Sequence, residues 1–144
     1  MPSITNAIDV KASPDEVWAV LADMSATRQW LPGVTTAHMD GDVRICRMAD
    51  GAEVRERISD IAPDQRSYRF EHLRVPLPVR RSGGTFTVTT GPDPETATVT
   101  LTTAFEPLDP AGTDQLAEMI HLAFQRSLES LRRYVEDKLR WDAA

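Results

Sequence analysis

The last third of the chain carries hydrophobic residues at helical spacing. From Leu116 to Leu139 they recur every three or four positions, which is typical of one face of an α-helix about six turns long. So long an apolar stripe needs a wide surface to cover it. The residues upstream predict mostly β-strands, so we expect the helix to pack across a sheet, with room for an apolar hollow between them.

The upstream segments alternate between apolar and polar residues, as half-buried strands do. The Asp50-Gly51 pair is typical of a hairpin turn, while Gly83-Gly84 is interpreted as the turn that starts a strand. A proline-rich segment, residues 75–79, is expected to be an apolar loop because proline removes a strand hydrogen-bond donor. The predicted strands are residues 4–11, 34–39, 43–49, 53–61, 67–73, 85–90 and 97–105.

Three helices are predicted. Ser13 with Glu16 forms a capping-box pattern around Pro14 and predicts a short helix that ends near Asp23. A second short helix is expected over residues 25–31, and Thr113 is the expected cap of the long helix. The order β-α-α-β-β-β-β-β-β-α predicts an α+β fold in one domain, residues 1–144.

Composition narrows the function classes. The net charge of −6 argues against nucleic acid and anionic membranes as partners, and no segment is apolar enough for membrane insertion. Cys46 is the lone cysteine, which excludes an intramolecular disulfide and favours the cytoplasm. The N-terminus lacks the pattern of a signal peptide. The three histidines are widely spaced, so we expect no metal site.

Several local sequences, taken in order, resemble the START/Bet v 1-like superfamily and within it the polyketide cyclase/dehydrase-like group. They are residues 12–18 (ASPDEVW), 30–34 (WLPGV), 55–58 (RERI), 68–70 (YRF) and 105–107 (FEP). The similarity spans residues 4–138. It implies a helix-grip fold, in which a seven-stranded curved antiparallel sheet wraps round the long helix and leaves a ligand cavity between them.

The resemblance implies binding of a small hydrophobic molecule, such as a lipid, an isoprenoid or a polyketide-like compound, without a cofactor, by a monomer or homodimer. The alternative is an enzyme that cyclises, aromatises or dehydrates a polyketide-like chain by acid-base chemistry. Aromatase/cyclases of the family carry an arginine toward the end of the strand that corresponds to residues 53–61. In this chain Ile61 aligns with that arginine, which weakens the enzyme alternative. A protein-interaction role is a third reading.

Glu56 is the first candidate for proton transfer. It shares a strand face with Val54 and Ile58, so it points inward if they do. A carboxylate in an apolar hollow has a raised pKa unless it is paired, and it could move a proton or bind the polar end of a ligand. An internal salt bridge or a place on the rim is the structural alternative.

His72 is the second candidate, with Tyr68 as a third. Tyr68, Phe70 and His72 share one face of their strand, and an imidazole near neutrality suits proton transfer. The alternative is a histidine that is merely hydrogen-bonded at the mouth of the cavity.

The ligand-binding residues are expected on the helix and on the inner faces of the strands. The first half of the long helix should face the hollow while its second half packs on the sheet, and Trp30 and Leu77 could close the cavity from opposite sides. Each could instead be an ordinary core residue. The predicted set is Trp30, Phe70, Leu77, Phe86, Leu101, Thr103, Met119, Ile120, Ala123 and Phe124.

Overall fold

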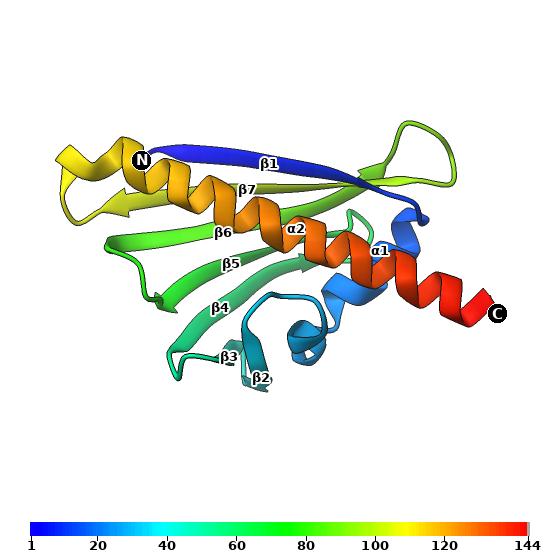
Figure 1. Ribbon diagram of the computed structural model, residues 1–144, viewed down its shortest axis with the longest axis horizontal. Helices are drawn as coiled ribbons and strands as arrows, with labels where there is room; N and C mark the ends of the chain where they lie inside the picture. The colour runs from blue at the N-terminus through cyan, green and yellow to red at the C-terminus, as the bar shows by residue number, and fades with distance from the viewer. Residues whose placement is uncertain (144) are drawn as a thin grey trace.

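The computed structural model describes residues 1–143, in which seven strands form one antiparallel sheet of order β1-β7-β6-β5-β4-β3-β2. The long helix α2 (Thr113–Ala143) crosses the sheet diagonally (Figure 1). This arrangement confirms the predicted α+β helix-grip fold. The strands are β1 (Ser3–Val10), β2 (Val34–Asp40), β3 (Val43–Met48), β4 (Glu53–Ala62), β5 (Ser67–Arg74), β6 (Val79–Thr90) and β7 (Ala97–Pro107).

The first short helix begins where its capping residues predict. Helix α1 (Pro14–Ala22) has the full capping box, in which the Ser13 side chain accepts from the Glu16 N–H and the Glu16 side chain accepts from the Ser13 N–H. The next turn is the 3₁₀-helix η1 (Met24–Gln29), shorter and tighter than the helix expected there. A further 3₁₀ turn, η2 (Pro110–Gly112), precedes α2, so Thr113 is a helical residue rather than the expected cap.

The prediction of a turn at Gly83-Gly84 is wrong, because β6 begins at Val79 and runs through both glycines. Gly84 lies opposite Phe70 of β5 in the ladder. A Cβ atom on Gly84 would come within 2.9 Å of the Phe70 ring. The glycine therefore lets the ring pack closely over its strand, which is a common reason for glycine inside a strand.

The main core lies beneath the second half of α2. Leu128, Leu131 and Val135 are buried there with residues of α1 and the inner face of the sheet. A smaller cluster of Phe105, Leu116 and Ile120 lies under the beginning of the helix. No helix in the described part of the chain combines the length and hydrophobicity needed to cross a membrane.

Candidate functional site

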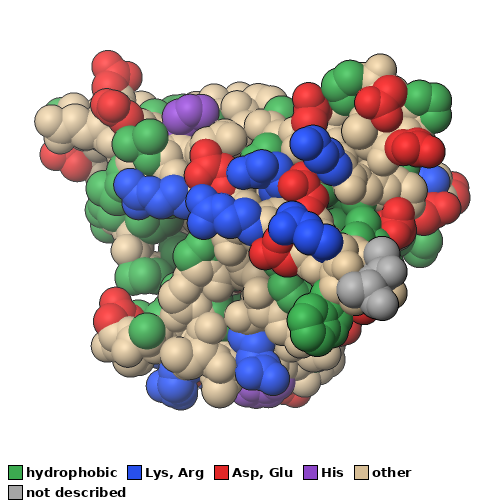
Figure 2. Space-filling view, turned by 45° about the vertical axis from the view of Figure 1, so that its right-hand side comes forward, with side chains coloured by type: hydrophobic (Ala, Val, Ile, Leu, Met, Phe, Trp, Pro, Cys, Tyr) green, Lys and Arg blue, Asp and Glu red, His purple; other side chains and the backbone are tan. Residues whose placement is uncertain are grey.

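A cavity of about 340 Å³ opens between the first half of α2 and strands β3, β4 and β5. Figure 2 shows the surface hollowed below a row of Lys and Arg side chains, with hydrophobic side chains beside the hollow. The residues that line the cavity form what we call the cavity wall. They are Leu31, Pro32, Cys46, Met48, Val54, Glu56, His72, Val75, Pro76, Leu77, Met119, Ile120, Ala123, Phe124, Arg126 and Ser127.

The space exists partly because α2 carries small side chains where it passes the hollow. Ala123 and Ser127 are one helical turn apart in the cavity wall, and the Ser127 hydroxyl donates to the Ala123 carbonyl at 3.1 Å. The hydroxyl thus stays on its own helix and leaves the cavity to apolar groups. A concave, mainly apolar wall with a few polar groups is typical of a small-molecule site.

Four polar side chains on adjacent strands form a connected row beside the cavity, which we call the polar chain. Arg44, Glu56, His72 and Ser82 come from β3, β4, β5 and β6 in that order. Glu56 lies opposite both Arg44 and His72 in the strand ladders. Arg44 Nε donates to Glu56 Oε1 at 3.1 Å, Glu56 Oε2 lies 3.6 Å from His72 Nε2, and Ser82 Oγ lies 2.7 Å from His72 Nδ1.

Arg44 anchors this chain from behind the cavity wall. Only 3% of its side chain is exposed, and its Nη1 donates to Thr27 Oγ1 at 3.0 Å. Glu56 points inward as predicted, and the structural alternative of an internal salt bridge is present as well. The Arg44 partner and the hydrogen bond offset part of the cost of burying the Glu56 carboxylate.

The imidazole of His72 is held between Ser82 and Glu56. Burial lowers the pKa of His72; Glu56 opposes this shift and Arg44 adds to it. The ring is therefore neutral at pH 7. A negative carboxylate beside Nε2 favours the tautomer with the proton on Nε2, which leaves Nδ1 to accept from the Ser82 hydroxyl.

Tyr68 and Cys46 flank the polar chain differently. The Tyr68 side chain is fully buried outside the cavity wall, and its hydroxyl finds no hydrogen-bond partner among residues 1–143. Burial raises the pKa of Tyr68, and it raises the pKa of the Cys46 thiol to about 11. Cys46 reaches the cavity wall as a neutral thiol, so it is not an activated nucleophile.

The structure separates the predicted ligand-binding residues into groups. Leu77, Met119, Ile120, Ala123 and Phe124 lie in the cavity wall, together with Glu56 and His72 from the predicted acid-base set. The remaining apolar aromatic and aliphatic side chains pack in the core outside that wall; these are Trp30, Phe86 and Leu101. The backbone carbonyl of Trp30 accepts a hydrogen bond from Ser130 of α2, which fixes this residue to the helix.

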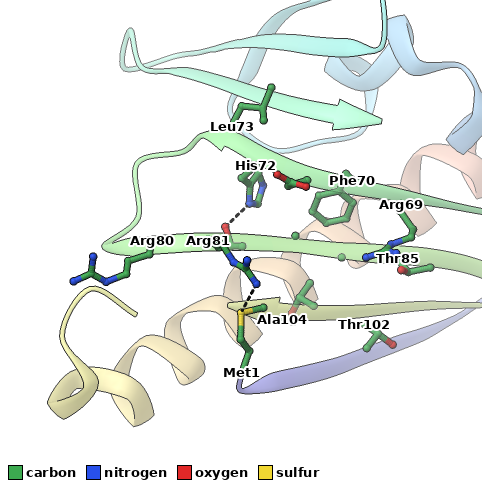
Figure 3. A pocket seen from close by; sticks show the side chains of 15 residues that line it. Met1, Arg69, Phe70, His72, Leu73, Arg80, Arg81, Thr85, Thr102 and Ala104 are labelled. Carbon is green, nitrogen blue, oxygen red and sulfur yellow. Dashed lines mark hydrogen bonds between the residues drawn. The ribbon is translucent and has the colours of Figure 1, made fainter. Parts of the chain in front are cut away.

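Phe70 and Thr103 are both buried, and the Phe70 ring packs with Phe86 in the core and with Phe124 of α2. Both residues also border a second depression, the outer groove, which opens on the side of the sheet away from α2 (Figure 3). It measures about 520 Å³ and includes the bare backbone of Gly83 and Gly84. Figure 3 shows Arg81 directed toward Met1. His72 is hydrogen-bonded to Ser82 on the neighbouring strand. The outer groove is larger and has Arg69, Arg80 and Arg81 at its border, but more of the candidate residues, including both Glu56 and His72, line the cavity.

Arg44 is the functional residue that the sequence reading missed. A signal was available, because Arg44, Cys46 and Met48 alternate along one strand and therefore share a face. An inward Cys46 would have placed the arginine inward too. Ser82 gave no such signal, since the two glycines after it had suggested a turn.

Comparison with known proteins agrees with this architecture. Residues 1–136 match the family described as "Polyketide cyclase / dehydrase and lipid transport". The chain belongs to this family. Among curated proteins no match is found.

Solved structures share the fold. XoxI from Bacillus cereus is 23% identical with a TM-score of 0.87, over 95% of this chain and 97% of that chain. The di-domain ARO/CYC BexL from the BE-7585A biosynthetic pathway is 22% identical with a TM-score of 0.83, over 94% of this chain and 47% of that chain. Norcoclaurine synthase from Thalictrum flavum, in complex with dopamine and hydroxybenzaldehyde, is 16% identical with a TM-score of 0.74, over 94% and 87%.

Proposed function

We propose that this protein binds a small hydrophobic molecule, of lipid, isoprenoid or polyketide-like type, in the cavity between α2 and the sheet. The observation that carries the proposal is the cavity of about 340 Å³ with its mainly apolar wall. This volume falls within the range of roughly 300–1,000 Å³ that is usual for small-molecule sites. The family description, which includes lipid transport, supports the same reading.

Burial of apolar surface would supply most of the affinity. Each Å² of apolar ligand surface removed from water contributes about 25 cal/mol, and the wall offers aliphatic and aromatic groups on several sides. One chain contains the complete cavity, so the proposal holds for a monomer and a homodimer alike. The lone buried Cys46 fits the cytoplasm, which we propose as the compartment.

The test is uptake of N-phenylnaphthylamine, a neutral dye whose fluorescence rises in apolar surroundings. We expect the wild-type protein to bind it, and Ala123→Trp to lose at least tenfold in affinity because the indole occupies the cavity. Leu122→Trp is the matched control, since Leu122 directly precedes Ala123 in α2 but lies outside the cavity wall. Absence of dye uptake by the folded wild-type protein, or equal uptake by all three proteins, would refute the proposal.

A catalytic function is the second candidate, and one observation favours it. Glu56 and His72 lie next to each other in the wall of an apolar cavity, where a carboxylate and a neutral imidazole could move protons on a bound polyketide-like chain. The structural neighbours include proteins whose names denote cyclisation and synthesis. Glu56→Gln and His72→Ala should then reduce turnover of such a substrate while dye uptake remains.

A further inference from the structure

We infer that the polar end of the cavity selects ligands bearing a neutral hydroxyl, an alcohol or a phenol, over carboxylates with the same apolar skeleton. The inference rests on the proposed binding function and adds the chemical class of the ligand's polar group. It is carried by the spacing of Glu56 and His72 in the cavity wall, together with the placement of Arg44 behind it.

The two polar atoms are spaced for an inserted oxygen. Glu56 Oε2 and His72 Nε2 lie 3.6 Å apart, slightly too far for a direct hydrogen bond. One oxygen placed beside this gap can lie within hydrogen-bond distance of both atoms. A hydroxyl suits the place because it donates its hydrogen to the carboxylate and accepts from the imidazole N–H.

The partners of the two residues fix these roles. Arg44 already occupies Glu56 Oε1, which leaves Oε2 as the acceptor on the cavity side. The carboxylate beside Nε2 favours the His72 tautomer whose proton is on Nε2, and the Ser82 hydroxyl, 2.7 Å from Nδ1, can then donate to Nδ1. One acceptor and one donor therefore stand side by side. A carbonyl ligand could accept from His72 but would leave Glu56 without a donor.

A ligand carboxylate at the polar end of the cavity would lie next to another negative charge. Glu56 brings its negative charge to the cavity wall, whereas Arg44 is buried behind it and lies outside that wall. The Arg44 guanidinium is also engaged, with Nε on Glu56 and Nη1 on Thr27. Like charges at close range in a poorly hydrated site repel strongly, so the anion should be rejected.

Arg126 of α2 is an alternative binding position for a ligand carboxylate. It is the one basic side chain that the described chain contributes to the cavity wall, and it is exposed to solvent. A carboxylate could bind with its charged end at Arg126 and its skeleton inside. A preference for carboxylates that depends on Arg126 would therefore contradict the inference.

Three probes with one skeleton test the selection, namely naphthalene, naphthol and naphthoate, each measured by displacement of N-phenylnaphthylamine at neutral pH. We expect naphthol to bind about tenfold more tightly than naphthalene, since a hydrogen bond to a charged group in a buried site contributes at least this factor. Naphthoate should bind most weakly. Glu56→Gln and His72→Phe should each reduce the naphthol advantage, whereas Arg133→Gln, at an exposed position of α2 outside the cavity wall, should leave it unchanged.

The variants must be folded for the result to count, so each is checked by its thermal unfolding transition. His72→Phe leaves the Arg44–Glu56 pair intact, and it tests the subsite even if Glu56→Gln fails to fold. If naphthoate equals or exceeds naphthol, or if the naphthol advantage survives both substitutions, the inference is overturned. If naphthalene and the dye also fail to bind, the proposed function itself is refuted.

Discussion

The two halves of α2 present the same hydrophobic periodicity to the sheet but meet different surroundings. In the second half, Leu131 is 0% exposed and packs in the main core. In the first half, Met119 is 51% exposed and belongs to the cavity wall. One half of the helix therefore fills space and supports the fold, while the other borders space that a ligand can occupy.

This difference depends on side-chain size and on the neighbouring elements rather than on periodicity. The second half carries leucine and valine at its most buried positions, Leu128, Leu131 and Val135, and α1 lies beside that half of α2 (Figure 1) and shares its core. The first half carries Ala123 and Ser127 at positions that face the cavity. A hydrophobic stripe thus predicts which face is buried, whereas the residue volumes decide whether that face is packed.

The largest loss of stability is expected at the polar chain, two of whose members, Glu56 and His72, line the cavity under the first half of α2. Arg44→Leu leaves the Glu56 carboxylate buried without its partner, and breaking a buried pair in this way costs about 3–5 kcal/mol of unfolding free energy. The difference in unfolding free energy between Arg44→Leu and wild type is measured by urea unfolding. Arg47→Leu, on the same strand but exposed and paired with Glu53, is the matched control and should change stability by less than about 1 kcal/mol.

If the double variant with leucine at both Arg44 and Glu56 is no more stable than Arg44→Leu alone, the unpaired charge is not the cause of the loss.

Next in size is the packed half of the helix. Leu131→Ala should destabilise the protein by about 2–5 kcal/mol because it opens a void in a filled core. Met119→Ala, on the same helix in the open half, should stay within about 0.5 kcal/mol of wild type. Both values come from urea unfolding. Equal losses in the two variants would remove the distinction between the halves.

A smaller effect is expected at Gly84. A methyl group there would lie 2.9 Å from both the Phe70 ring and the Thr103 side chain, and 2.8 Å from a backbone oxygen. Overpacking of this kind costs about 1–3 kcal/mol, so Gly84→Ala should lower the thermal unfolding midpoint. Gly112→Ala is the control, since a Cβ there meets no atom of the described residues within 4 Å. Identical midpoints for both variants would contradict the close packing of Phe70.

The smallest effect is a pH dependence at the cavity. Burial lowers the pKa of His72, so below the ordinary histidine pKa of about 6.5 the unfolded chain takes up a proton that the folded protein resists. This contribution to stability is complete above that pH and is lost as the pH falls. We expect His72→Phe to lose less stability than wild type between pH 7 and pH 5, measured by urea unfolding.

His38→Gln replaces an exposed histidine and should follow the wild-type curve in that experiment. Parallel curves for wild type and His72→Phe would show that His72 is solvated in the folded protein.

The fold could be predicted from sequence because its signals are local. The capping box at Ser13, the hairpin at Asp50-Gly51 and the alternation in each strand all depend on residues a few positions apart. The exception was β6, where Gly83-Gly84 imitates a turn. Only the packing of Phe70 over the strand, a contact across the ladder, explains glycine there.

The candidate site was harder to predict from the sequence because it depends on the register between strands. Glu56 and His72 were expected inside from alternation alone, and the structure places both in the cavity wall. Alternation could not show that Arg44 lies opposite Glu56, or that Ser82 reaches His72. The same limit applies to Phe86 and Leu101, because an inward side chain can end in the core or at a cavity, and periodicity does not distinguish these outcomes.

The polar chain also has an evolutionary consequence. Each of its members satisfies a neighbour on the next strand, so replacing one alone leaves a buried polar atom without a partner. Related sequences should therefore exchange these positions together, as compensated sets, while Met119 or Leu77 drifts independently. Paired substitution at positions 44, 56, 72 and 82 would mark lineages whose cavity binds a different chemical class of ligand.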